Sequence, residues 1–172
     1  MEWEAISQRT VRWVQPKVFR RAYELRAGEQ PVGSLQFEKT LSSLATAKLA
    51  AWEWGFEREG LWSRRLRVCQ AGSKGNLAVF QSDWRGNGVL TLADGGSVAW
   101  KRQNFWGTEW AFLTPSGQAM VGFKREVGLK MAARVTLRRA YADRPETPLL
   151  MALGWYLIVL RRRKRQRHAA GA

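Results

Sequence analysis

The stretch TPLLMALGWYLIVLRRRKRQRH, residues 147–168, decides the fold of this chain. No residue from 149 to 160 carries a charge, and six of the seven residues from 161 to 167 are Lys or Arg. Such a segment is either a membrane anchor with a basic flank or a buried helix whose basic end reaches the protein surface. The choice between the two determines what kind of protein this is.

The segment carries the start and end signals of a helix. Thr147 suits the N-cap, Pro148 suits the first helical position, and the basic cluster suits the C-terminal end of the helix dipole. We expect a helix at about 147–165 and a disordered tail at 166–172. Because its first part is apolar on every face, lipid or protein must surround it. The residues expected to be enclosed are Leu149, Leu150, Leu153, Trp155, Tyr156, Leu157 and Leu160.

The length of the apolar run favours enclosure by protein. A membrane-spanning helix needs about 20 apolar residues to cross about 30 Å of hydrocarbon. The 12 residues from 149 to 160 reach only about 18 Å. Asp143, Arg144 and Glu146 prevent an upstream extension. A short tail-anchored membrane protein is the alternative interpretation.

Most of the remaining chain alternates between apolar and polar residues. In residues 130–138 (KMAARVTLR), Met131, Ala133 and Val135 alternate with polar residues such as Arg134, which is typical of a strand with one buried face. Asp-Gly and Asn-Gly pairs between such segments favour tight hairpins. The other expected strands are 9–15, 21–27, 31–38, 61–69, 76–82, 87–93, 96–102, 108–114 and 117–124. Residues 41–56 fit either a helix or two strands.

These patterns together predict a mainly β fold. Closing a sheet into a barrel removes its edges, and a barrel of this size has a lumen that must be filled. We expect a closed antiparallel β-barrel of about 11–12 strands around a central hydrophobic C-terminal α-helix, forming one domain over residues 1–165.

The order of elements resembles the tubby C-terminal-like superfamily, which includes the LURP-one-related proteins and the phospholipid scramblases, and it is most similar to small bacterial members. The stretches that carry the resemblance are WSRRLRV (62–68), AVFQSDW (78–84) with Gly88-Val89-Leu90, Asp94-Gly95, Asn104-Phe105-Trp106 with Glu109-Trp110, and the final PLLMALGWYLIVL. The resemblance implies a barrel of about twelve strands threaded by the C-terminal helix. It also favours two strands, about 45–51 and 52–58, over a helix.

The chain departs from that superfamily in ways that limit what can be transferred. It has no acidic segment like the calcium site of scramblases, no cysteine-rich lipidation segment, and a shorter terminal helix. The phosphoinositide-binding residues of the tubby domain cannot be matched one by one to this chain. We therefore expect no calcium-dependent scrambling and transfer no site.

The charge of the chain points to anionic partners. Twenty-nine Lys and Arg stand against 14 Asp and Glu, a formal net charge of +15. We expect binding to an anionic phospholipid surface, or tethering of a partner at the membrane; nucleic acid is the alternative ligand, and solubility alone is the third interpretation. The candidate anion-binding residues are Arg161, Arg162, Arg163, Lys164, Arg165, Arg167, Lys124 and Arg125, with Arg138 and Arg139 as extensions.

Residues for catalysis are scarce. The chain has one His and one Cys, so no zinc set and no Cys–His pair can form. Asp83 and Glu109 could in principle act as paired carboxylates, but we interpret Asp83 as a turn cap and Glu109 as a partner of Lys101 and Arg102. We expect a non-enzymatic protein without metal or cofactor. The acidic start of the chain has no signal-peptide pattern, which predicts a cytoplasmic location, extending to the inner membrane face.

The ten Trp residues are an unusually large number for a chain of this length. Eight of them are Trp52, Trp54, Trp62, Trp84, Trp100, Trp106, Trp110 and Trp155. We interpret these mainly as core and hairpin packing, with base stacking or a membrane-interface belt as alternatives. Trp106, in a Phe-Trp-Gly turn, is the one expected to be exposed.

Overall fold

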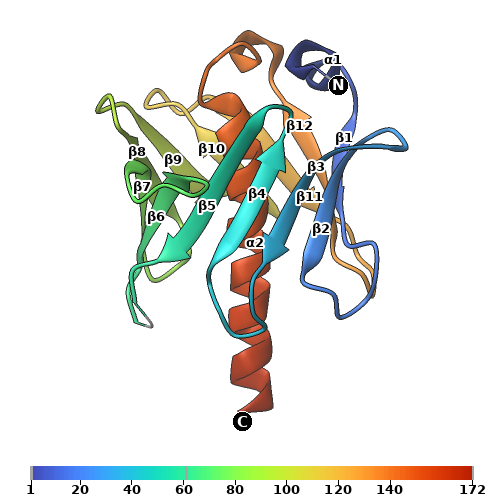
Figure 1. The fold of residues 1–172 in the computed structure, drawn as a ribbon, viewed down its shortest axis with the longest axis vertical. Helices are drawn as coiled ribbons and strands as arrows, with labels where there is room; N and C mark the ends of the chain where they lie inside the picture. The colour runs from blue at the N-terminus through green and yellow to red at the C-terminus, as the bar shows by residue number, and fades with distance from the viewer. Residues whose placement is uncertain (1, 61, 172) are drawn as a thin grey trace.

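The computed structural model describes residues 2–60 and 62–171 and shows a closed barrel of twelve antiparallel strands around one long helix (Figure 1). This confirms the predicted fold class. The strands are β1 Val11–Val14, β2 Ala22–Ala27, β3 Gln30–Phe37, β4 Ala45–Leu49, β5 Trp52–Arg58, β6 Arg65–Gln70, β7 Asn76–Ser82, β8 Gly88–Leu92, β9 Ser97–Arg102, β10 Glu109–Leu113, β11 Ala119–Arg125 and β12 Ala132–Leu137. The helices are α1 Trp3–Ser7, the 3₁₀ turn η1 Arg139–Tyr141 and α2 Thr147–Ala170.

Each strand pairs with its neighbours in sequence, and the barrel closes where β1 pairs with β12. In that seam, Val11 lies opposite Val135 and Trp13 lies opposite Ala133. Closure leaves no strand edge open among the described strands, so backbone groups are paired all the way round. The ambiguous segment 41–56 forms the hairpin of β4 and β5, as the strand interpretation predicts.

The alternation of side chains along the strands directs apolar residues into the barrel. In β12, Ala133 and Val135 are buried while Arg134 and Thr136 are exposed. Buried residues from each of the twelve strands form one cluster with the buried part of α2, which is apolar on every face. The barrel interior is therefore a packed core, and α2 fills it.

Aromatic contacts fix the helix inside the barrel. The Trp155 ring stacks on Trp13 with centroids 6.0 Å apart, and Trp13 Nε1 donates a hydrogen bond of 3.1 Å to the carbonyl of Met151. Leu149, Leu150, Leu153, Trp155 and Tyr156 are buried, and Leu157 and Leu160 are half-buried where the helix leaves the barrel. Within residues 2–60 and 62–171, no helix has the length and apolarity needed to cross a membrane.

The ends of α2 differ from the sequence-based boundaries. Thr147 is the first helical residue rather than the N-cap, and its Oγ1 donates to the carbonyl of Tyr141 at 2.6 Å. The helix continues to Ala170, so residues 166–170 of the predicted tail are helical rather than disordered, and residue 172 lies outside the described residues. Extending an existing helix adds one hydrogen bond per residue without a new nucleation cost, and Arg, Gln and Ala are good helix formers. The short helix α1 was not predicted.

Gly154 offers a test of how closely the helix fits the barrel. A Cβ at this position would lie 2.3 Å from Cε2 and Cζ of the buried Phe123 ring. Gly154→Ala gains about 1 kcal/mol of helix propensity, but we expect the clash to dominate and the free energy of unfolding to fall by about 1–3 kcal/mol. Gly55→Ala is the control because its Cβ meets no atom within 4 Å. Urea unfolding showing that Gly154→Ala stabilises the protein would contradict this packing.

Candidate functional site

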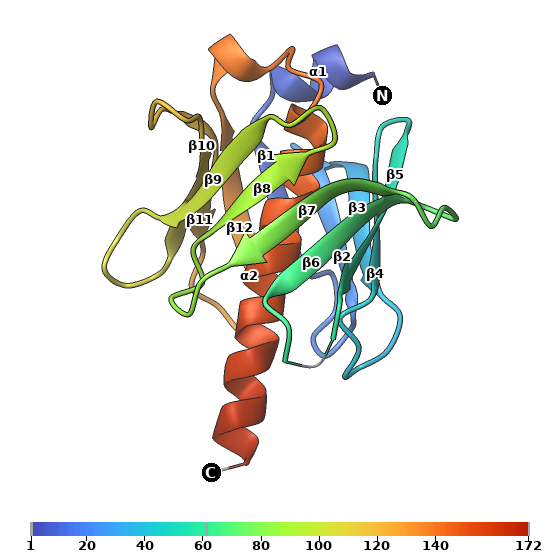
Figure 2. The same ribbon diagram turned by 90° about the vertical axis from the view of Figure 1, so that its left-hand side faces the viewer.

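One end of the barrel gathers the features expected of a binding surface. The C-terminal part of α2 leaves the barrel there and projects beyond the surrounding loops (Figure 2). Six hairpin loops surround it, because the antiparallel strands return to this end at every second turn. We call this surface the basic end; its loops are 15–21, 38–44, 59–60 with 62–64, 83–87, 103–108 and 126–131, and its helical part is 161–170.

The charge of the protein is concentrated at this end. In sequence, the loops and the helix end hold thirteen Lys and Arg against four Asp and Glu, a net charge of +9. The opposite end, formed by residues 2–10, 138–146 and the other hairpin turns, holds five basic and six acidic residues. The formal charge is therefore distributed unevenly along the barrel axis, with the positive excess at the basic end.

Two arginines of the basic end also attach the helix to the loops. Arg161 Nη1 donates to the carbonyl of Arg85 at 3.0 Å, and its guanidinium lies 5.1 Å from the Trp110 ring centroid. Arg163 Nη1 donates to the carbonyl of Ser42 at 3.0 Å, and Nη2 donates to the carbonyls of Lys39 and Thr40. These two side chains hold the loops in place, so their charge is only part of their role.

Four arginines surround a cleft of about 320 Å³ beside the helix. Arg125 enters it from the end of β11, and Arg161, Arg162 and Arg165 enter it from α2. Burial lowers the pKa of Arg125, and the charges of Arg162 and Arg165 lower it further. Burial likewise lowers the pKa of Arg161, with Arg165 as the next cause. No carboxylate lines the cleft among the described residues, so its positive charge is uncompensated.

The structure divides the predicted anion-binding residues into two groups. Arg125 and the six basic residues of α2 meet at the basic end, but Lys124 does not. Neighbouring strand residues point to opposite faces, and Lys124 lies outside the barrel wall with its Nζ 3.3 Å from a carboxylate oxygen of Glu109. The segment between β12 and α2, which contains Arg138 and Arg139, lies at the opposite end (Figure 1).

Large apolar side chains are exposed on every loop of the basic end. Among the described residues, all eight large apolar side chains that are at least 70% exposed lie on these loops. They are Phe19, Leu41, Trp62, Trp84, Phe105, Trp106, Val127 and Leu129. We call them the apolar tips. The most exposed large apolar side chains therefore gather at one end of the barrel, and such gathering is a feature of interaction surfaces.

The Trp residues divide between the core and this surface. Trp54, Trp100, Trp110 and Trp155 are buried, as the core interpretation predicts. Trp106 is 78% exposed, as predicted, whereas the exposure of Trp62 (95%) and Trp84 (73%) contradicts the core interpretation. Trp52, on the barrel wall, is 40% exposed.

Asp83 and Glu109 have structural partners. Asp83 Oδ1 accepts hydrogen bonds from the backbone N–H groups of Arg85 (2.8 Å) and Asn87 (3.0 Å), so it caps the turn as predicted. Glu109 pairs with Lys124, across to β11, rather than with Lys101 and Arg102. Neither carboxylate thus shows the arrangement of a catalytic pair.

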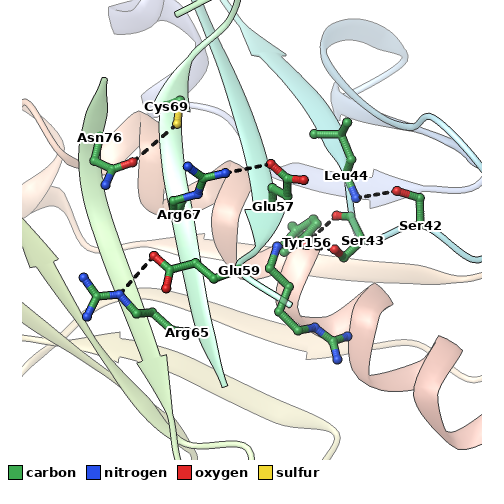
Figure 3. A network of polar contacts seen from close by, with 11 residues as sticks. Ser42, Ser43, Leu44, Glu57, Glu59, Arg65, Arg67, Cys69, Asn76 and Tyr156 are labelled. Atoms are coloured by element: carbon green, nitrogen blue, oxygen red, sulfur yellow. Dashed lines mark hydrogen bonds and ion pairs between the residues drawn. The ribbon is translucent and has the colours of Figure 1, made fainter. Parts of the chain in front are cut away.

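Loop 38–44 is held from inside the barrel by Tyr156. Its hydroxyl donates a 2.6 Å hydrogen bond to the carbonyl of Ser43 (Figure 3). The same view shows the outer wall, where Arg67 pairs with Glu57 at 3.1 Å. The loop that Arg163 binds from the solvent side is therefore also fixed from the core, which positions the Leu41 tip.

The buried tyrosines Tyr23 and Tyr156 make the free energy of unfolding fall as the pH rises into the alkaline range. Burial raises the pKa of Tyr156, and likewise that of Tyr23, above the ordinary value of 10.0. The unfolded chain therefore loses these protons first, and the stabilisation present below pH about 10 is lost as pH rises. Because the unfolded chain is half ionised at pH 10, Tyr156→Phe should remove about 1 kcal/mol of the loss between pH 10 and 11. Denaturant titrations in which both proteins lose stability equally over this range would contradict the assignment.

Comparison with known proteins adds no relative. No known family matches the chain, and neither the curated proteins nor the solved structures gave a match. The resemblance to the tubby C-terminal-like superfamily therefore stays a prediction, and any function must be argued from the basic end itself.

Proposed function

We propose that the protein is a non-enzymatic peripheral membrane protein that docks end-on against anionic phospholipid, at the cytoplasmic face, through its basic end. The observation that carries this proposal is the coincidence of two independent features on one end. The apolar tips occupy all six loops, and the same loops with the helix end have a net charge of +9. A membrane-bound barrel of this kind could hold a partner at the surface through its opposite end.

The two features match the two parts of a membrane interface. Each Lys or Arg near an anionic surface contributes about 1 kcal/mol, and Trp is favoured where headgroups meet acyl chains. Trp62, Trp84 and Trp106 lie around the helix on three different loops. In end-on docking these rings reach the boundary of the acyl region while Lys164, Arg165 and Arg167 lie among the headgroups.

Nucleic acid is the second candidate, and one observation favours it. The guanidinium of Arg85 lies 4.6 Å from the Trp84 ring centroid, and exposed aromatic and arginine groups can stack on bases. The aliphatic tips argue against nucleic acid, because Leu41, Val127 and Leu129 have no flat ring that could stack on a base. Their exposure is better matched by hydrocarbon, so lipid is the preferred ligand.

Vesicle binding tests the proposal directly. The intact protein should bind vesicles of phosphatidylglycerol and phosphatidylcholine, bind vesicles of phosphatidylcholine alone at least ten times more weakly, and lose affinity with salt. A single-stranded oligonucleotide at equal phosphate concentration should compete poorly. Equal binding to both vesicles, or retention of the oligonucleotide in preference to the anionic vesicles near physiological salt, would overturn it.

Substitutions at the apolar tips distinguish binding by insertion of apolar side chains into the membrane from binding by electrostatic attraction alone. The double variant Trp62→Asn/Trp106→Asn leaves the charge unchanged and should weaken vesicle binding at least tenfold. The control Leu77→Asn/Val89→Asn removes two partly exposed apolar side chains from the barrel wall (40% and 44% exposed) and should change binding less than twofold. Equal behaviour of the two double variants would show that the tips do not enter the membrane.

A further inference from the structure

A second cleft at the basic end has the chemistry of a site for a single lipid molecule. It has a volume of about 530 Å³ and lies between α2 and the loops 15–21, 38–44 and 126–131. This volume is within the range of about 300–1,000 Å³ that is typical of small-molecule sites. It lies on a different side of the helix from the cleft around Arg125, and the two share only Arg162 and Gln166.

One part of the cleft is apolar. Its floor is formed by the buried side chains of Tyr23, Phe37 and Met131. Its outer wall includes the exposed tips Leu41 and Leu129. The apolar surface therefore runs continuously from the core of the barrel to the tips that we propose enter the membrane.

The other part of the cleft is cationic. Five arginines line it, and no carboxylate does so among the described residues. They are Arg20, Arg21, Arg162, Arg163 and Arg167. Arg163 and Arg21 already use some of their hydrogen-bond donors within the protein. Arg163 donates to loop carbonyls, and Arg21 Nη1 donates to the carbonyl of Glu38 at 2.8 Å. For Arg162 and Arg167 the structure shows no hydrogen bond or ion pair with a described residue, which leaves their guanidinium groups for an anion.

We propose that this cleft binds one anionic phospholipid, with the phosphate against Arg162 and Arg167 and the start of an acyl chain along Leu129, Leu41 and Phe37. Charge complementarity selects the head, because guanidinium groups bind phosphate oxygens in pairs. The apolar wall favours a phosphate that carries an acyl chain over a phosphate without one. The inference rests on the proposed function and deepens it, since it adds one stoichiometric site to a surface that otherwise binds by general attraction.

Soluble short-chain lipids test the site without a membrane. The intact protein, with ¹³C-labelled methionine methyl groups, is titrated with dihexanoyl-phosphatidylglycerol below its critical micelle concentration. We expect saturable one-to-one binding that shifts the methyl resonance of Met131, in the cleft floor, and not that of Met120, inside the barrel in β11. Glycerol 3-phosphate, which lacks the chain, and dihexanoyl-phosphatidylcholine, which lacks the net charge, should each bind at least tenfold more weakly. Equal binding of all three compounds, or a shift at Met120 alone, would overturn the proposal.

Matched variants locate the binding and distinguish the two proposals. Arg167→Gln and Leu129→Asn should each weaken binding of the soluble lipid at least fivefold, whereas Arg165→Gln, which removes the same charge outside this cleft, should not. Trp62→Asn/Trp106→Asn should bind the soluble lipid normally while losing vesicle binding. If the intact protein binds anionic vesicles but shows no saturable binding of the soluble lipid, the cleft proposal fails and the proposed function stands. If it binds the soluble lipid but not the vesicles, the end-on docking fails instead.

Discussion

Replacing Trp155 with alanine is expected to lower the free energy of unfolding by about 3–5 kcal/mol. The indole is fully buried at the centre of the barrel, where it stacks on Trp13 and meets Tyr23 edge-on at 5.6 Å. Removing it leaves a cavity that closed strands on all sides cannot collapse to fill. A loss of this size is a large share of the stability of a single domain.

The exposed Trp62 provides the matched control. The same Trp-to-Ala change at this 95% exposed position should alter stability by less than about 0.5 kcal/mol. Trp155→Phe should recover part of the loss, since it refills most of the cavity and removes an indole N–H that has no hydrogen-bond partner among the described residues. Urea unfolding in which Trp155→Ala costs less than Trp62→Ala would show that α2 is not enclosed by the barrel.

Neutralising the free cations of the helix end is expected to lower affinity for anionic vesicles by up to about 1,000-fold. The variant changes Arg162, Lys164, Arg165 and Arg167 to Gln and spares Arg161 and Arg163, which bind loop carbonyls. Four cations at about 1 kcal/mol each give about 4 kcal/mol, and each 1.4 kcal/mol is about tenfold. The fold should be unaffected because Lys164, Arg165 and Arg167 are exposed, and the half-buried Arg162 makes no hydrogen bond or ion pair with a described residue.

A variant with the same net charge distinguishes location from total charge. Changing Arg9, Lys74, Arg138 and Arg139 to Gln removes four charges from exposed positions at the opposite end. Its vesicle affinity should fall less than about fivefold, through the weaker long-range field alone. Equal losses in the two variants, measured by sedimentation with anionic vesicles, would mean that net charge and not the basic end determines binding.

The barrel could be predicted because the strand periodicity, the turn residues and the length of the apolar run all indicated the same fold. Alternation at Ala133 and Val135 fixed the buried face of a strand, Asp-Gly and Asn-Gly pairs marked hairpins, and the 12-residue apolar run was too short for a membrane. Strand ends differ more: β6 begins at Arg65, so residues 62–64 of the predicted strand 61–69 lie outside it, and residue 61 lies outside the described residues. Local pattern specifies which residues face inward, but the end of pairing depends on the neighbouring strands.

The binding surface could be predicted only in part. The basic run 161–167 was visible in the sequence, but the apolar tips were not, apart from Trp106. Phe19, Trp62 and Leu129 are far apart in sequence and come together only because alternate hairpins of a closed barrel share one end. The error at Lys124 has a similar cause, since one step along a strand separates the inner from the outer face.

The central claim is that the basic end, and no other part of the barrel, faces the membrane. Replacing Cys69 with Ser allows a single cysteine to carry a bimane fluorophore, either at Trp106, on loop 103–108, or at Asp94, in a hairpin turn at the opposite end. On anionic vesicles containing nitroxide-labelled lipid, we predict strong quenching at position 106 and almost none at position 94. Quenching at position 94 equal to or greater than that at position 106 would contradict end-on docking.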